Sequence, residues 1–393
     1  MPISKKIRDF ATQSSWIRKM FEQGLKLKAE KGADNVFDFT LGNPNLEPPE
    51  QFKATLLEVA SDRSPGGHAY MPNAGITSTR EAVARYLSGV HSLDLSSANI
   101  IITCGAGGAI NVVLKTLLDP GDEVLFPSPF FVEYKFYVDN HGGVPRPVMS
   151  RDDFSLDLEG FGRAVSEKTK AVLINSPNNP TGKVYSRESL EALAGLLERK
   201  SREYGKEIYL ISDEPYRDIV YDNVEIPSVL KLYANSFAVS SYSKDLSIPG
   251  ERLGYIAVNP GIANFSETLD GLVLCNRILG YVNAPALMQR VVERIQGVKV
   301  DAGIYQRKRD LFCKGLIAQG YELHIPEGAF YLFPKSPIPD DVEFTRALLE
   351  ENILVVPGSG FGGPGHIRIA YCVTDSSIEK ALPGFGRVLK KYI

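Results

Sequence analysis

Residues 236–255 read SFAVSSYSKDLSIPGERLGY, in which an apolar run is followed by a lysine between two polar residues and by an arginine eight positions later. The second half has neither the period of about 3.6 residues of a surface helix nor the alternation of a half-buried strand. We therefore predict a strand at the start of this stretch and interpret the charges after it as chemically functional.

Five further apolar runs occur along the chain, separated by longer segments with a helical pattern. SRESLEALAGLLERKSREYG (186–205) has the apolar spacing of a helix that covers a sheet face. This alternation predicts an α/β fold, with a large domain built on a mostly parallel sheet flanked by helices. The runs are NIIITC (99–104), DEVLFP (122–127), KAVLIN (170–175), EIYLIS (207–212) and GYIAVN (254–259).

The pattern changes after about residue 285. A long helical segment begins with LMQRVVERIQ (287–296), and short strand-like pieces with turns follow it up to HIRIAY (366–371). We expect a smaller α+β domain there, which the N-terminal residues join because chain termini often meet. The predicted division is 46–285 for the large domain, and 1–45 with 286–393 for the small one.

Composition excludes several classes of function. The 393 residues are 44% hydrophobic and 23% charged, with a formal net charge of −3, so nothing favours nucleic-acid binding and we expect small-molecule ligands. The N-terminal 32 residues read as an amphipathic helix without the apolar core of a signal peptide, and no run is long enough to cross a bilayer. We expect a cytoplasmic protein without a metal site or disulfides, because its four cysteines are widely spaced: Cys104, Cys275, Cys313 and Cys372.

Polar, glycine-rich or aromatic groups follow five of the apolar runs. In an open parallel sheet, ligands bind beyond the carboxyl ends of the strands, so these groups should meet in one crevice. The segments are GAGGAI (105–110), SPFFVEY (128–134), SPNNPTG (176–182), DEPY (213–216) and YSKDLS (242–247).

The glycine turn GAGGAI opens a predicted helix. Its free N–H groups at Ala106 and Gly107 are suited to binding a phosphate. Ile110 stands where a G-x-G-x-x-G motif needs its last glycine, so a close-packed turn is the alternative.

Two charged residues at strand ends suggest a cofactor. Asp213 would be withdrawn from water and needs a partner such as a protonated heterocyclic nitrogen, unless it only caps the next helix. Lys244 would act as a Schiff-base nucleophile if burial lowers its pKa, the alternative being a solvated surface lysine. Arg252 offers a planar fork for a phosphate, and the hydroxyls of Ser241 and Ser243 could add hydrogen bonds.

Two further residues have a structural and a functional interpretation. Arg368 lies between alternating isoleucines, so it would either form an interior ion pair or grip a substrate carboxylate. Phe131 would belong to the core or form a stacking platform.

These motifs together resemble the class I and II aminotransferases, pyridoxal-phosphate enzymes of fold type I that include the aspartate aminotransferases. The resemblance runs from LGNPNLEPP (41–49) to HIRIAY (366–371) and rests on order and spacing. It implies a sheet of the seven-stranded type, a homodimer, pyridoxal 5′-phosphate as cofactor, and transfer of an amino group from an L-amino acid to a 2-oxo acid in two half-reactions.

The resemblance also implies roles for individual residues. Lys244 would hold the cofactor and move the proton, and Asp213 would pair with the pyridinium nitrogen. Asn179 and Tyr216 would bind the phenolic oxygen of the ring. The remaining roles are phosphate binding by Ser241, Arg252, Ala106, Gly107 and a partner subunit's Tyr70, a further cofactor contact by Ser243, ring stacking by Phe131, and substrate carboxylate binding by Arg368 with Gly42 and Asn179 nearby.

The residues leave other activities open. A carbon–sulfur β-lyase would use the same catalytic groups, and a non-catalytic effector-binding protein could share the fold. Arg277 lies near the region where some relatives place an arginine for dicarboxylic side chains, without clearly matching it. Aromatic, branched and small neutral donors therefore stay open as well.

Overall fold

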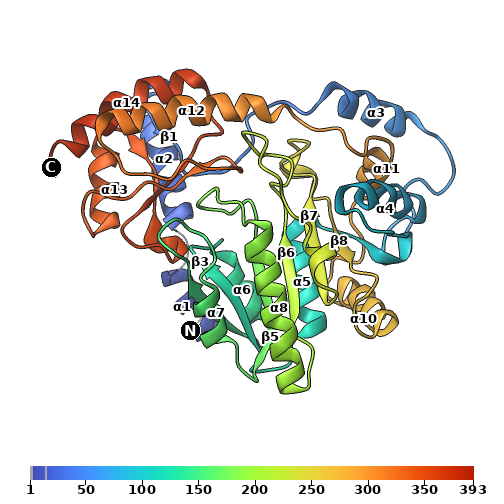
Figure 1. The fold of residues 1–393 in the computed structure, drawn as a ribbon. Coiled ribbons are helices and arrows are strands. Elements are labelled where there is room, and N and C mark those ends of the chain that lie inside the picture. The colour runs from blue at the N-terminus through green and yellow to red at the C-terminus, as the bar shows by residue number, and fades with distance from the viewer. Residues whose placement is uncertain (1–2, 14–15) are drawn as a thin grey trace.

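A seven-stranded sheet forms the centre of the computed structural model, which describes residues 3–13 and 16–393 (Figure 1). The strand order is β2-β8-β7-β6-β5-β3-β4. Strand β8 is antiparallel to both neighbours and the other adjacent pairs are parallel, which confirms the predicted α/β fold. The strands are β2 (Ile100–Thr103), β3 (Glu123–Ser128), β4 (Val144–Met149), β5 (Thr169–Asn175), β6 (Tyr209–Asp213), β7 (Ser236–Ser241) and β8 (Gly254–Val258).

Helices cover both faces of this sheet. Val124 and Phe126 of β3 share a core with residues of α5 (Gly105–Leu117) and α10 (Phe265–Ile278). Leu125, between them, packs instead with residues of α8 (Arg187–Tyr204). Successive strand residues thus point to opposite faces, and because both faces are covered the strands read as continuous apolar runs.

Helix α8 matches the segment predicted from its apolar spacing. The hydroxyl of Ser186 caps its start by accepting a hydrogen bond from the N–H of Ser189 at 3.2 Å. Gly205 ends it with a left-handed φ of 63°, which glycine adopts without a steric penalty.

Strand β4 was not predicted from the sequence. Its segment, VPRPVM, contains Pro145 and Pro147, which cannot donate hydrogen bonds to a neighbouring strand. The strand pairs with β3 alone, at the edge of the sheet. An edge position tolerates prolines that a central strand would not.

The C-terminal part forms its own core around a three-stranded antiparallel sheet with the order β11-β12-β9. A second small sheet pairs β1 with β10 in parallel, which joins the N-terminal segment to the C-terminal part (Figure 1). These strands are β1 (Phe37–Asp38), β9 (Tyr331–Leu332), β10 (Ile353–Leu354), β11 (Val356–Pro357) and β12 (Ile367–Ala370). The predicted domain boundary near residue 285 stays a prediction. Helix α11, which follows it, packs against α3 and α4.

The remaining helices lie around these sheets. Within the predicted N-terminal helix the structure describes α1 and α2. No helix in the described part of the chain combines the length and the apolar character that crossing a membrane requires. The helices are α1 (Lys5–Gln13), α2 (Trp16–Lys31), α3 (Glu50–Ser61), α4 (Thr77–His91), α6 (Glu133–Asn140), α7 (Leu158–Ala164), α9 (Val229–Leu232), α11 (Ala286–Arg294), α12 (Ala302–Gln319), α13 (Asp341–Glu350) and α14 (Asp375–Leu389), with 3₁₀ turns at Ala33–Asn35, Ser97–Asn99, Pro249–Glu251 and Gly358–Phe361.

Candidate active site

A pocket of about 360 Å³ lies at the edge of the sheet where the parallel strands end. Strands β5, β6 and β7 end there with Asn175, Asp213 and Ser241. Because β8 runs the opposite way, Arg252, just before its first residue, reaches the same edge. The predicted site residues that line this pocket are Gly42, Ala106, Gly107, Phe131, Asn179, Asp213, Tyr216, Ser241, Ser243, Lys244, Arg252 and Arg368.

Lys244 extends into the pocket from the turn after β7. Its Nζ donates a hydrogen bond to the carbonyl oxygen of Gly42 at 2.8 Å, and the ring centroids of Tyr216 and Phe330 lie 5.9 and 5.4 Å from it. Burial lowers the pKa of Lys244 to about 8. The residue is therefore not a solvated surface lysine, and a useful fraction of its amine is neutral and nucleophilic near pH 7.

Asp213 ends β6 with its carboxylate inside the protein. Its Oδ2 accepts a hydrogen bond from the phenol of Tyr134 at 2.5 Å, while its Oδ1 is buried and has no partner among the described residues. Burial raises the pKa of Asp213 to about 7. The residues after it form a turn, so the helix-cap interpretation is wrong.

Asn175, at the end of β5, holds two neighbouring parts of the site. Its side-chain N–H donates to the carbonyl oxygen of Asp213 at 2.9 Å, and its Oδ1 accepts from the backbone N–H of Asn179 at 2.6 Å. The side-chain oxygen of Asn179 in turn accepts a hydrogen bond from Arg368 at 3.1 Å. One network thus joins the Asp213 end and the Arg368 end of the pocket.

Arg368, on β12, is 2% exposed and lies between two aromatic rings. Its guanidinium carbon is 4.7 Å from the ring centroid of Tyr331 and 4.4 Å from that of Phe361. It donates to the carbonyl oxygen of Thr40 at 2.5 Å. No carboxylate in the described part of the chain forms an ion pair with it, so the interior ion-pair interpretation is wrong, and its Nε lacks a partner there.

The first turn of α5 lies against Arg252. Gly105 has a φ of 75°, and a Cβ there would stand 2.7 Å from the Arg252 guanidinium. Gly254, at the start of β8, approaches the Gly105 backbone so closely that a Cβ would be 2.7 Å from its carbonyl carbon. The two glycines therefore bring an arginine beside the unpaired N–H groups of a helix start, which is a suitable site for an anion.

Gly42 also occupies a position that a larger residue could not. A Cβ there would lie 1.8 Å from the phenolic oxygen of Tyr331. That oxygen is 2.9 Å from the phenolic oxygen of Tyr216, with which it shares a hydrogen bond. Gly42 thus provides both space for the tyrosine pair and the carbonyl that accepts from Lys244.

Two residues from the sequence analysis lie away from this pocket. Tyr70 is 93% exposed, so its predicted role in a partner subunit stays a prediction. Arg277 is exposed on α10 and does not line the pocket of its own chain.

Phe131 lines the pocket and also meets Tyr134 edge to face, with ring centroids 5.6 Å apart. It therefore packs against the core and faces the pocket at the same time.

The structure adds site residues that sequence reasoning missed. Tyr134, Tyr331 and Glu133 were not singled out from the sequence. Glu133 and Tyr331 line the pocket, and Tyr134 donates to Asp213 behind it. Glu133 and Tyr134 come from α6 and Tyr331 from β9, and tertiary packing brings them together. The only local signal was the place of Glu133 and Tyr134 in or beside the polar segment after β3, and Tyr331 had none.

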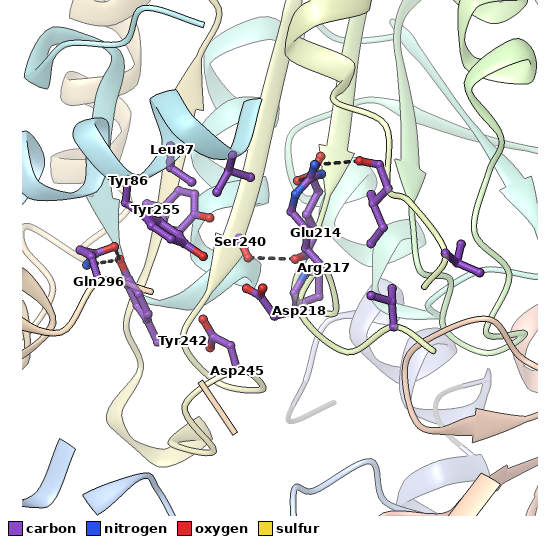
Figure 2. A pocket seen from close by; sticks show the side chains of 15 residues that line it. Tyr86, Leu87, Glu214, Arg217, Asp218, Ser240, Tyr242, Asp245, Tyr255 and Gln296 are labelled. Carbon is purple, nitrogen blue, oxygen red and sulfur yellow. Dashed lines mark hydrogen bonds and ion pairs between the residues drawn. The ribbon is translucent and has the colours of Figure 1, made fainter. Parts of the chain in front are cut away.

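A second cavity, of about 170 Å³, is lined by Glu214 and Asp245, which directly follow Asp213 and Lys244 in the sequence (Figure 2). Asp218 and Asp245 lie close together in it, beside a group of tyrosines. Burial, followed by the charge of Asp218, raises the pKa of Asp245 to about 8. The residue directly after the pocket lysine is therefore an acid held in an unfavourable setting.

Comparisons with known proteins agree with this geometry. The chain matches the family model described as aminotransferase class I and II over residues 34–385. It is 34% identical over 373 residues to the aspartate/prephenate aminotransferase of Thermus thermophilus, covering 93% of this chain and 94% of that protein. It is 32% identical over 393 residues to aromatic-amino-acid aminotransferase 2 of Thermococcus litoralis, covering 96% of each.

Solved structures give the same result. The crystal structure of an amino transferase from Eubacterium rectale superimposes with a TM-score of 0.96 and 38% sequence identity, covering 100% of this chain and 99% of that one. The aspartate aminotransferase from Thermus thermophilus with maleate gives a TM-score of 0.88 and 30% identity, covering 99% and 100%.

Proposed function

This chain belongs to the class I and II aminotransferases and transfers amino groups between amino acids and 2-oxo acids, and from that premise we propose that its pocket holds pyridoxal 5′-phosphate covalently on Lys244. The family assignment confirms the predicted enzyme class and fold type. The identity of the cofactor in this chain and the role of each residue are our proposals.

The unpartnered oxygen of Asp213 is the observation that carries this proposal. A buried carboxylate oxygen without a donor is costly, and the N–H of a pyridinium ring would satisfy it while compensating its charge. Such a partner would bring the pKa of Asp213 back down from about 7, so that both groups stay charged. The bound cofactor supplies an electron sink for negative charge at the substrate α-carbon.

The other contacts would fix the cofactor at its two ends. Arg252, the hydroxyls of Ser241 and Ser243, and the N–H groups of Ala106 and Gly107 would bind the phosphate. The close approach of Arg252 to Gly105 supports this assignment. At the other end, Phe131 would stack on the ring, and Asn179 and Tyr216 would bind its phenolic oxygen.

Lys244 would perform the proton transfer. Once the amine of the substrate had displaced it, the neutral Nζ of Lys244 would take the proton from the substrate α-carbon and would pass that proton to the bound cofactor. A pKa near 8 suits both tasks at neutral pH. The hydrogen bond to the carbonyl of Gly42 orients the amine without protonating it.

Arg368 would bind the α-carboxylate of the substrate. Its guanidinium is held between the rings of Tyr331 and Phe361, and its Nε has no partner in the described chain. A planar carboxylate could therefore accept a hydrogen bond from this Nε with little rearrangement of the arginine. Fixing the carboxylate decides which bond at the α-carbon is aligned for cleavage, which favours proton removal.

Product analysis with a matched lysine variant tests this function. The cofactor-loaded protein, given an L-amino acid and a 2-oxo acid, should form the new oxo acid and the new amino acid in equal amounts. Lys244→Ala should bind the cofactor without a covalent link and form neither product. Ammonia release in place of a second amino acid, or full turnover by Lys244→Ala, would contradict the proposal.

The proposal also includes the oligomeric state, the domain division and the cellular location of the protein. We propose a homodimer in which the partner subunit's Tyr70 completes the phosphate site, which is consistent with its 93% exposure here. We propose a large domain of residues 46–285 and a small domain of residues 1–45 and 286–393, because the sequence pattern changes after about residue 285. A cytoplasmic location is supported by four unpaired cysteines in the described chain.

A further inference from the structure

Glu133 brings a negative charge to the pocket that the catalytic scheme does not use. It is the first residue of α6, and its side chain lines the same pocket as Lys244 and Arg368. Its Oε2 is buried without a hydrogen-bond partner among the described residues. No Lys, Arg or His of the described chain forms an ion pair with it.

Glu133 does not form an ion pair with Arg368, and the surroundings of the two residues explain why. The guanidinium of Arg368 already donates to Asn179 and to the carbonyl of Thr40, and it lies between aromatic rings. Burial raises the pKa of Glu133, while its own backbone N–H and then the charge of Arg368 lower it in part. Glu133 is therefore near enough to Arg368 for each to influence the pKa of the other, and its unpartnered Oε2 can meet a ligand bound there.

The cations that the described chain brings to the pocket all have other roles in the proposed scheme. Lys244, Arg252 and Arg368 are the lysine and arginine residues that line it in the described chain. They serve, in turn, the covalent link, the phosphate and the α-carboxylate. A second carboxylate on a substrate would therefore meet no spare cation of this chain, but would meet Glu133.

We propose that Glu133 is a specificity-determining residue that selects amino donors whose side chain ends in a hydrogen-bond donor and disfavours dicarboxylic amino acids. A terminal ammonium or amide would satisfy the buried carboxylate, whereas a carboxylate would add a like charge. This inference rests on the proposed function, because it places the substrate α-carboxylate on Arg368.

Isosteric pairs of ligands test it directly. Glutamine and glutamate differ at one terminal atom, so the ratio of their kcat/KM values with the same acceptor isolates the terminal group. We expect the wild-type protein to favour glutamine by roughly 10- to 100-fold, the scale of one hydrogen bond to a charged group. Glu133→Gln should reduce this ratio at least about tenfold. Glu191→Gln, the same change on the exposed face of α8, should leave it unaltered.

Binding of unreactive analogues separates this inference from the proposed function. Glutaramate and glutarate lack the α-amino group, so their dissociation constants for the cofactor-loaded protein, measured by calorimetry, do not depend on turnover. Glutaramate should bind more tightly by a similar factor, and Glu133→Gln should narrow the difference. A Glu133-dependent binding ratio without any turnover would support the specificity and refute the aminotransferase chemistry. A preference for glutamate and glutarate, or ratios that Glu133→Gln does not change, would overturn the inference.

Discussion

The phenolic hydroxyl of Tyr134 donates to Oδ2 of Asp213 at 2.5 Å and leaves the Oδ1 of the same carboxylate unpartnered. The hydrogen bond lowers the pKa of Asp213, against the larger effect of burial. Tyr134 thus favours the ionised form of Asp213, which is proposed to bind the pyridinium nitrogen. The Oδ1 of Asp213 stays available for that nitrogen.

Removal of this hydroxyl should weaken cofactor binding. Tyr134→Phe keeps the ring but leaves Asp213 with one stabilising contact fewer, a loss of about 0.5–1.5 kcal/mol or roughly 2- to 10-fold in Kd. Asp213→Asn, which removes the charge itself, should cost roughly 10- to 100-fold. Titration of the cofactor-free proteins with pyridoxal phosphate at pH 7 measures both. Equal affinities of Tyr134→Phe and the wild type would show that the hydrogen bond is not used.

The pKa of Lys244 predicts how cofactor attachment depends on pH. Only the neutral amine attacks, and its fraction rises with pH until the pKa of about 8 is passed. The rate of covalent attachment to the cofactor-free protein should therefore increase from pH 6 to about 8 and level off above that value. Stopped-flow absorbance measures this rate. A rate that keeps rising to pH 10, as for an exposed lysine, would contradict the lowering of the Lys244 pKa by burial. Lys244→Ala, which cannot form the covalent link, is the control.

Gly42→Ala should disturb both stability and activity. The added Cβ would stand 1.8 Å from the phenolic oxygen of Tyr331, so this side chain or the loop must move. Overpacking of this kind costs about 1–3 kcal/mol, measurable by urea unfolding. Because Tyr331 holds Tyr216 and contacts Arg368, kcat/KM should fall as well. Gly89→Ala is the matched control, since its Cβ would meet nothing within 4 Å on helix α4. Equal stability of both variants would contradict the close contact.

Asp245 should make the protein less stable as the pH rises. Its pKa is raised from 3.8 to about 8, so between these values the folded state keeps a proton that the unfolded chain has released. This contribution to the free energy of unfolding is complete below pH 3.8 and lost as the pH passes about 8. Asp245→Asn, which keeps an acceptor for the N–H of Leu246, should therefore gain stability over the wild type between pH 5 and 9. We expect a gain above about 1.4 kcal/mol, the equivalent of one pKa unit. A constant difference across this range would refute the shift.

Much of the site could be predicted because its residues follow apolar strands in one order. Asp213 ends a strand, Lys244 and Asn179 come shortly after one, and the topology of a parallel sheet brings such residues together. Arg252 reaches the same edge for a different reason, since β8 is antiparallel and the residue precedes it. Arg252 could thus be predicted from the sequence, whereas the antiparallel direction of β8 could not.

The residues that were missed depend on packing between distant segments. Tyr331 meets Tyr216 across 115 positions of sequence, and Tyr134 meets Asp213 across 79. No local period indicates such contacts. Strand β4 was missed because Pro145 and Pro147 argue against a strand, and only its edge position removes that objection. The free carboxylate of Glu133 could be recognised only once its neighbours were known.

The most direct test of the account is the absorbance spectrum of the cofactor-loaded protein, recorded before and after one amino acid is added without any 2-oxo acid. We predict that a competent donor converts the bound pyridoxal form to the pyridoxamine form, that one equivalent of the matching oxo acid appears, and that Lys244→Ala does not complete this conversion. An unchanged spectrum with every donor, or ammonia released while the pyridoxal form persists, would contradict the claim that this pocket performs half of a transamination on Lys244.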